Sequence, residues 1–227
     1  MKFNLTKKIL AWYDNNKRTL PWRVGKSSTN LLYYRVLSEF MLQQTQVKTV
    51  IPYFEKFTKK FCTLESLSKA SENKILKLWE GLGYYRRARN LLATSKIIVK
   101  KYKSKLPREV DQIKTLPGVG DYTSNVLAAL IYNTPTLALD GNVKRVISRV
   151  LNKEVNKIDF KYFKNINRKN LFSTSRNSDF VEAMMEFGAL VCNAKIPKCE
   201  ICPIRKNCKF YNSKKKIKQI KRETINK

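Results

Sequence analysis

The fold is decided by residues 108–132, which read REVDQIKTLPGVGDYTSNVLAALIY. A short helical segment, 108–115, is followed by a tight turn, 116–120, and a second helical segment, 121–132. Gly118 and Gly120 permit a sharp turn and let backbone N–H groups approach a phosphate without a side-chain clash. We expect Asp121 to cap the second helix, whose start adds a positive dipole end. The stretch therefore predicts two short helices joined by a tight turn that anchors DNA phosphate groups without reading sequence.

Helical periodicity extends from this hairpin in both directions. The helices predicted before it cover 1–20, 31–50, 52–57, 66–79 and 85–102, and those after it cover 142–151 and 178–192. Residues 152–177 are poorly patterned, and a basic tail with little core signal begins at Lys209. No segment alternates convincingly with a period of two, and Gly and Pro number only 7 each. We therefore expect an all-α fold.

The charge of the chain restricts the class of its partner. Its 227 residues include 47 Lys and Arg against 17 Asp and Glu, a net charge of +30. This excess indicates a polyanion such as DNA, RNA or an anionic membrane, although the abundance of Lys, Asn and Ile is also typical of an A+T-rich genome. The charged N-terminus and the lack of a long apolar run predict a cytoplasmic, nucleoid-associated protein with no export signal and no membrane partner.

Four of the five cysteines cluster late in the chain, with six, two and five residues between them: Cys192, Cys199, Cys202 and Cys208. Thiolates this close can surround one metal centre, and sulfur selects an iron–sulfur cluster or zinc. A zinc ribbon usually has two Cys-x-x-Cys pairs. One pair flanked by two single cysteines favours a [4Fe–4S] cluster over zinc and over unliganded core cysteines. Cys62 stands alone and is interpreted as a small packed residue.

Two carboxylates each have two interpretations. Glu39 lies mid-helix and is either a solvated helix-face charge or a functional acid, and Asp140 is either an ordinary N-cap or a functional carboxylate. Together they suit cleavage of an N-glycosidic bond, which needs an acid to protonate the leaving base and a carboxylate to stabilise an oxocarbenium-like sugar. Partial burial would raise the pKa of Glu39, and a more polar site would keep Asp140 ionised.

Several longer motifs resemble a known family. They are LPWR at 20–23, SEFMLQQTQV at 38–47, GLGYY at 81–85, RARNL at 87–91, LPGVG at 116–120, LDGNVKRV at 139–146 and AMMEFGA at 183–189, followed by the cysteine loop. In this order, from about residue 8 to 210, they resemble MutY-type adenine DNA glycosylases. The resemblance implies a two-lobed, all-α helix-hairpin-helix glycosylase fold with a C-terminal [4Fe–4S] loop. One lobe would comprise 1–28 and 132–227, and the other 29–131.

The same resemblance implies roles for individual residues. Glu39 would protonate adenine at N7, Asp140 would stabilise the cationic sugar, and Tyr122 and Asn142 would assist these carboxylates. Duplex DNA would lie between the lobes, with the target adenine flipped out of the stack. The implied substrate contacts are Trp22, Arg23 and Glu182 in the base pocket, Gln44 and Tyr84 at the opposite strand, and Gly118 and Gly120 in the hairpin. Gln44 and Tyr84 have a second interpretation as packed helix-end residues.

Tyr122 discriminates within the superfamily that the chain resembles. Endonuclease III-like members carry a lysine here, and this lysine forms a Schiff base that leads to strand cutting. A tyrosine cannot form an imine. We therefore expect a monomeric, monofunctional DNA N-glycosylase in base excision repair, without lysine-dependent lyase activity. Its substrate would be duplex DNA with adenine mispaired with 8-oxoguanine or guanine.

Three other functions fit part of these observations. They are a thymine or uracil glycosylase of the same fold acting opposite guanine, a non-catalytic iron–sulfur DNA-binding protein, and an RNA-binding protein. The chain also departs from the family that it resembles, because MutY-type enzymes usually continue into a Nudix-like domain that helps read 8-oxoguanine. Here the sequence ends at Lys227, in a basic stretch that resembles the start of the linker to that domain. A protein without that domain should discriminate less well between 8-oxoguanine and guanine opposite adenine.

Overall fold

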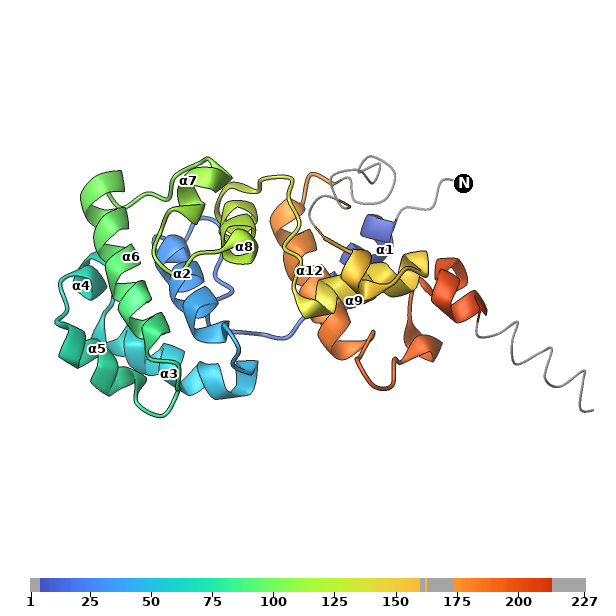
Figure 1. Ribbon diagram of the computed structural model, residues 1–227, viewed down its shortest axis with the longest axis horizontal. Coiled ribbons are helices and arrows are strands. Elements are labelled where there is room, and N and C mark those ends of the chain that lie inside the picture. The colour runs from blue at the N-terminus through green and yellow to red at the C-terminus, as the bar shows by residue number, and fades with distance from the viewer. Residues whose placement is uncertain (1–4, 160–161, 163–173, 214–227) are drawn as a thin grey trace, which may run out of the picture. The chain divides into compact units, whose positions relative to one another are not determined.

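The computed structural model describes residues 5–159, 162 and 174–213. These residues divide into two compact units: unit 1 contains the chain up to Lys17 and from Leu137 onward, and unit 2 contains Arg18–Thr136 (Figure 1). The all-α prediction is confirmed for the described residues, whose regular elements are all helices. The predicted lobe boundaries at 28/29 and 131/132 stay a prediction, because compactness alone does not test which parts of a chain fold independently.

Unit 2 is built around a central helix, α2. Its helices are α2 (Leu31–Leu42), α3 (Val47–Lys60), α4 (Leu64–Ser68), α5 (Glu72–Trp79), α6 (Arg86–Tyr102), α7 (Val110–Lys114) and α8 (Asp121–Tyr132). Helices α3, α6 and α8 pack on α2 (Figure 1). On α2, Val36, Leu37, Phe40 and Met41 are fully buried, so apolar side chains face its neighbours on more than one side. This packing makes α2 the rigid support of the residues at its C-terminal end.

Several helix boundaries predicted from the sequence are wrong, including the end of the first helix, which lies at Asn16 and not at residue 20. The helix predicted for 31–50 ends at Leu42, and α3 begins at Val47, so Pro52 lies inside α3 and not at its start. Between the two helices, Gln44 has a φ of +56°, a left-handed conformation that a right-handed helix cannot continue through. The helix predicted for 66–79 is divided into α4 and α5, because each begins at its own hydroxyl N-cap.

Unit 1 places α12 (Asn177–Leu190) against both α1 (Leu5–Asn16) and α9 (Gly141–Leu151). Three short 3-10 turns accompany these helices: η1 (Val155–Lys157), η2 (Cys199–Ile201) and η3 (Arg205–Asn207). Arg176, just before α12, pairs with Asp14 of α1 at 2.6 Å and with Asp179 at 2.8 Å. These ion pairs, together with the apolar contacts of α12, fix the start of that helix against α1.

Two sequence predictions fall partly or wholly on residues outside the described ranges. Of the poorly patterned stretch 152–177, the structure describes 152–159, 162 and 174–177, and it describes nothing of the chain from Lys214 onward. In the described part, none of the helices has both the length and the apolar character needed to cross a membrane.

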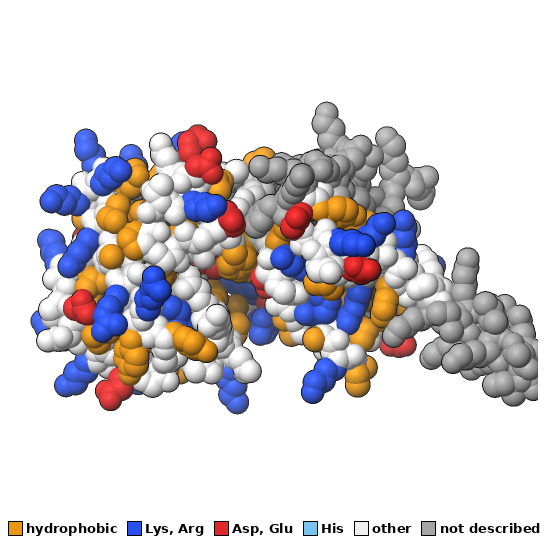
Figure 2. All heavy atoms as spheres, viewed as in Figure 1, with side chains coloured by type: hydrophobic (Ala, Val, Ile, Leu, Met, Phe, Trp, Pro, Cys, Tyr) orange, Lys and Arg blue, Asp and Glu red, His pale blue; other side chains and the backbone are white. Residues whose placement is uncertain are grey.

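Basic side chains are distributed widely over the face of the molecule drawn in Figure 2, on both units, and acidic side chains are far fewer. This distribution agrees with the net charge of +30. A charge spread so widely favours contact with an extended polyanion over a single pocket for a small anion.

Helices α9 and α12 come unusually close where Gly188 faces Asn142. A β-carbon added to Gly188 would lie 2.7 Å from Cβ of Asn142 and 3.2 Å from its Cα. Because one of these atoms belongs to the backbone of α9, rotation of a side chain cannot relieve the clash. Gly188 therefore sets the spacing of the two helices.

We predict that Gly188→Ala lowers the free energy of unfolding by about 1–3 kcal/mol, because the added methyl group forces α9 away from α12. Thermal denaturation followed by circular dichroism measures this change. The matched control is Gly141→Ala in the first turn of α9, where an added β-carbon meets open space. A wild-type melting temperature in Gly188→Ala, or an equal loss in both variants, would contradict this account of the helix spacing.

Candidate functional site

The hairpin predicted from the sequence joins α7 to α8 and rests on α6. Gly118 has a φ of +75°, and a β-carbon there would meet the Asn90 side chain of α6 at 2.6 Å. Both the conformation and the contact therefore require glycine. On the same helix, Thr94 Oγ1 donates to the carbonyl of Pro117 at 2.9 Å. Gly120 has open space around its α-carbon, so it meets no such steric requirement.

The prediction that Asp121 caps α8 is wrong. The N-cap is Gly120, and Asp121 is the first residue of the helix. Its carboxylate pairs with Lys114 of α7 at 2.5 Å, and this hydrogen bond raises the pKa of Lys114. The ion pair places a carboxylate that is paired with a lysine beside the helix N-terminus at which an anion is expected to bind.

Glu39 lies in the last turn of α2 and is only 7% exposed. It is therefore not a solvated helix-face charge. One turn later, Gln43 Nε2 donates to the carbonyl of Gly118 at 3.3 Å and lies 3.5 Å from Thr123 Oγ1, next to the half-buried Tyr122. Unit 2 thus joins the end of α2, the hairpin and the start of α8 through a single glutamine.

Two other predicted residues of unit 2 lie in or near its core. Trp22 is buried in the hydrophobic core and meets the ring of Phe54 edge-on at 5.4 Å. Arg23 is partly buried and donates from Nη1 to the carbonyl of Arg18 at 2.8 Å. These contacts hold both residues in place, and their role in a base pocket stays a prediction.

Gln44 and Tyr84 are exposed and have left-handed backbones. Tyr84 is 64% exposed with a φ of +49°, and Gln44 is exposed with a φ of +56°. Non-glycine residues adopt this conformation uncommonly. Packing does not explain either side chain, so the interpretation of these two as packed helix-end residues is wrong.

In unit 1, Asp140 caps α9, as one of its two interpretations proposed. Its Oδ1 accepts the Val143 N–H at 2.6 Å, and its Oδ2 accepts a hydrogen bond from Asn142 Nδ2 at 3.1 Å. Burial nevertheless raises the pKa of Asp140, because these hydrogen bonds and the charge of Arg145 only partly offset the loss of solvation. The polar contacts therefore favour the ionised form of Asp140, as expected, but burial outweighs them in the net shift of its pKa.

Sequence reasoning missed Arg145, which links Asp140 to the cysteine loop. Its Nη2 donates to Asn142 Oδ1 at 2.7 Å and to the carbonyl of Gly188 at 2.9 Å, and its Nε donates to the carbonyl of Cys192 at 2.9 Å. A continuous chain of hydrogen bonds therefore runs from the Asp140 carboxylate to the first cysteine. Only the position of Arg145 in the LDGNVKRV motif marked it in the sequence.

Glu182, the remaining predicted residue of unit 1, lies on α12. It is buried, and its Oε2 accepts a hydrogen bond from the Tyr13 hydroxyl of α1 at 3.2 Å. Burial of a carboxylate raises the free energy of the folded state unless hydrogen bonds or charges compensate for it. The role of Glu182 in a base pocket stays a prediction.

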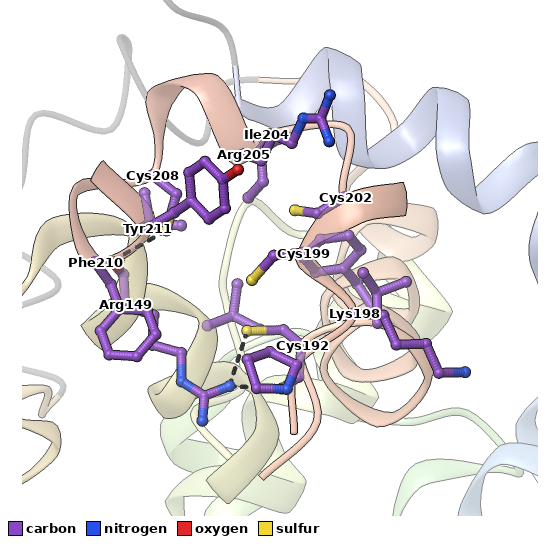
Figure 3. A pocket seen from close by; sticks show the side chains of 15 residues that line it. Arg149, Cys192, Lys198, Cys199, Cys202, Ile204, Arg205, Cys208, Phe210 and Tyr211 are labelled. Atoms are coloured by element: carbon purple, nitrogen blue, oxygen red, sulfur yellow. Dashed lines mark hydrogen bonds between the residues drawn. The ribbon is translucent and has the colours of Figure 1, made fainter. Parts of the chain in front are cut away.

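The four predicted ligand cysteines line one pocket of about 390 Å³, a volume that includes its open mouth. Figure 3 shows the sulfur atoms of Cys192, Cys199, Cys202 and Cys208 facing this pocket. Arg149 of α9 also lines it, and its Nη1 donates to Cys192 Sγ at 3.4 Å and to the carbonyl of Asn193 at 2.7 Å. Phe210 and Tyr211 also line the pocket, although the sequence placed them in a tail with little core signal. The fifth cysteine, Cys62, is exposed, so its interpretation as a packed residue is wrong.

The donor set limits which metal centre the four cysteines fit. Among the described residues, no three Cys, His, Asp or Glu side chains lie close enough together to hold one metal ion. Four thiols lining one pocket are donors that suit an iron–sulfur cluster or zinc. Burial and the neighbouring cysteines raise the pKa of Cys202 to about 11, and a positive centre would be needed to hold these groups as thiolates.

This chain is similar in sequence to known DNA repair proteins. A family model described as HhH-GPD superfamily base excision DNA repair protein matches residues 37–168. The adenine DNA glycosylase of Buchnera aphidicola subsp. Baizongia pistaciae (strain Bp) is 40% identical over 211 residues, which cover 91% of this chain and 58% of that protein. The adenine DNA glycosylase of Rattus norvegicus is 38% identical over 212 residues, which cover 89% of this chain and 41% of that protein.

A solved structure of a thermostable thymine-DNA glycosylase has the same fold. Its TM-score is 0.80 at 26% identity, and the match covers 92% of this chain and 95% of that chain. This chain spans less than two thirds of the length of the two curated relatives. The segment matched by the family model contains Glu39, the hairpin and Asp140. The chain belongs to the HhH-GPD superfamily of base excision DNA repair proteins.

Proposed function

We propose that this protein is a monofunctional DNA glycosylase that removes adenine mispaired with 8-oxoguanine or guanine from duplex DNA. The observation that carries the proposal is Glu39, a buried carboxylate in the last turn of α2, because Gln43 connects the end of that helix to the hairpin. A buried carboxylate beside a DNA-anchoring element is a candidate for acid catalysis. The two relatives named adenine DNA glycosylase, at 40% and 38% identity, support adenine as the base.

In the proposed reaction, two carboxylates have different tasks. Glu39 donates a proton to N7 of the leaving adenine, which weakens the N-glycosidic bond. Asp140, in its ionised form, stabilises the positive charge that develops on the sugar until water adds. Asn142 donates to Oδ2 of Asp140 and favours the ionised form of that carboxylate. Tyr122, at the start of α8, assists the two carboxylates and supplies no amine for an imine.

The remaining site residues position the substrate of a monomeric enzyme. In this proposal Trp22, Arg23 and Glu182 each contact the flipped base, Gln44 and Tyr84 contact the opposite strand, and Gly118 and Gly120 contact the phosphate backbone. The left-handed conformation and exposure of Gln44 and Tyr84 support their assignment. The fixed conformation of Gly118 supports the assignment of the hairpin.

We also propose that Cys192, Cys199, Cys202 and Cys208 hold a [4Fe–4S] cluster. Support comes from the pocket that the four cysteines share and from their sequence pattern, one Cys-x-x-Cys pair flanked by two single cysteines. When bound, the cluster would cross-link the loop that carries the four cysteines and would take no part in bond cleavage. Arg149 donates to Cys192 Sγ, a hydrogen bond that stabilises a thiolate.

A second candidate is a thymine or uracil glycosylase acting opposite guanine. The observation that favours it is the similarity to the thymine-DNA glycosylase structure, with a TM-score of 0.80. That structure is 26% identical in sequence, whereas the two adenine glycosylases are 40% and 38% identical over a similar share of this chain. We therefore prefer adenine.

We predict that Glu39→Gln and Asp140→Asn each slow single-turnover release of adenine by about 10²–10⁴-fold, the range for loss of a general acid or base. Asparagine is as good an N-cap as aspartate, so Asp140→Asn tests the charge with α9 preserved. The control is Glu55→Gln, an exposed glutamate on α3. A wild-type rate in either active-site variant would contradict the role assigned to that residue.

We predict that Asn142→Ala moves the acid limb of the single-turnover rate to higher pH. Burial raises the pKa of Asp140, and the Asn142 amide opposes this rise because it donates to the ionised carboxylate. Its removal raises the pKa further, so Asp140 is protonated, and activity lost, at a higher pH than in the wild type. A rate profile measured on both proteins tests this, and an unmoved limb or a shift to lower pH is the contrary result.

We predict that borohydride traps no covalent complex between the wild-type protein and an adenine-mispair duplex, because Tyr122 has no amine. Tyr122→Lys places an amine at this position, and we expect it to yield a trapped complex and a nicked strand. Denaturing gel electrophoresis detects both products. Trapping by the wild type to the same extent as by Tyr122→Lys would disprove the monofunctional assignment.

A further inference from the structure

Arg87, in the first turn of α6, is buried, and its guanidinium donates to backbone carbonyls from two separate segments. Nη1 donates to three carbonyls at the end of α2, and Nη2 donates to two carbonyls in the turn before α6. The acceptors are Phe40 at 3.3 Å, Met41 at 2.7 Å and Gln43 for Nη1, and Leu82 and Gly83, both at 3.2 Å, for Nη2.

Burial makes this arrangement costly, since the loss of solvation lowers the pKa of Arg87. A buried cation persists only where hydrogen bonds and opposing charge replace its water. Here the negative end of the α2 dipole and its unsatisfied carbonyls supply that charge. The planar guanidinium is suited to the task because its donors point in fixed directions.

Two of the five acceptors belong to the peptide groups that precede Gln44 and Tyr84. The Gln43 carbonyl is part of the peptide that ends at the Gln44 nitrogen, and the Gly83 carbonyl is part of the peptide that ends at the Tyr84 nitrogen. Holding each carbonyl restricts the φ of the following residue, which is +56° at Gln44 and +49° at Tyr84. The Arg87 guanidinium also lies 5.4 Å from the Tyr84 ring centroid.

We propose that Arg87 is a positioning residue that holds Gln44 and Tyr84 in their left-handed conformations and sets the spacing between these two exposed side chains. This inference rests on the proposed function, in which both side chains contact the strand opposite the target base. Gln44 and Tyr84, which are distant in the sequence, then contact the stacked bases as one rigid pair. Their backbone needs no ordering when DNA binds.

The test compares Arg87→Lys, which keeps the charge but loses the planar fork, with a matched control, Arg89→Met. Arg89 lies on the same helix but is exposed and pairs with Glu72 at 2.8 Å. For Arg87→Lys we expect base release from an adenine:8-oxoguanine duplex, at saturating protein, to slow about tenfold or more. We expect Arg87→Lys to remain folded at the assay temperature, as its melting curve will show. We expect Arg89→Met to have the wild-type rate and melting temperature. Equal rates in Arg87→Lys and the wild type would overturn the proposal.

A double-mutant cycle distinguishes positioning from general stabilisation of unit 2. If Arg87 acts through Tyr84, then Arg87→Lys should slow the Tyr84→Ala protein far less than it slows the wild type. Added guanidinium ion should restore part of the rate of a third variant, Arg87→Ala, by occupying the vacated position. Additive losses without guanidinium rescue would mean that Arg87 only stabilises the fold, and the proposal would be wrong.

The same cycle separates this inference from the proposed function. If the wild type releases no base from any duplex, the proposed function fails. The cycle is then measured on the dissociation constant for the mismatched duplex, where Arg87→Lys and Tyr84→Ala should again be non-additive. Additivity in binding would overturn the positioning role independently of catalysis.

Discussion

The structure depends on satisfying the carbonyl oxygens at the ends of two helices that have no glycine C-cap. The last carbonyls of a helix have no partner within it, and left-handed glycine turns commonly satisfy them. The C-cap residue is Gln43 in α2 and Val191 in α12, so other donors are needed. Arg87 supplies them for α2. For the end of α12 and the loop after it, Arg145 and Arg149 of α9 supply them. Arginine suits this task because one planar group can reach several carbonyls.

These arginines position residues of the candidate site as well as the ends of the helices. In unit 2, the donor set at the end of α2 fixes the turn after Glu39, and Gln43 then connects this turn to the hairpin. In unit 1, the arginines connect α9, whose N-cap is Asp140, to the backbone around Cys192. Loss of one donor would therefore disturb both a helix end and the candidate site beside it. The close approach of α9 and α12 at Gly188 has the same consequence, because Asn142 lies at the contact.

Much of the fold and of the candidate site was predictable from local pattern. The periodicity of α6, α8, α9 and α12, the LPGVG turn and the four clustered cysteines all act over a few residues, where sequence alone carries the signal. The prediction was wrong where the decisive contact is distant or the local signal is weak. The turn after α2 has no Gly or Pro, and its left-handed Gln44 is held by Arg87 from more than forty residues away. The pKa of Asp140 follows from burial, which the surrounding Gly, Asn and Arg residues did not indicate.

The central claim is that the protein removes adenine from mispairs. It is tested most directly by identifying, by mass spectrometry, the free base that the wild-type protein releases from three duplexes, carrying adenine opposite 8-oxoguanine, adenine opposite guanine and thymine opposite guanine. The account predicts release of adenine from the first two duplexes and of no base from the third. Release of thymine without adenine, or of no base from any duplex, would contradict it.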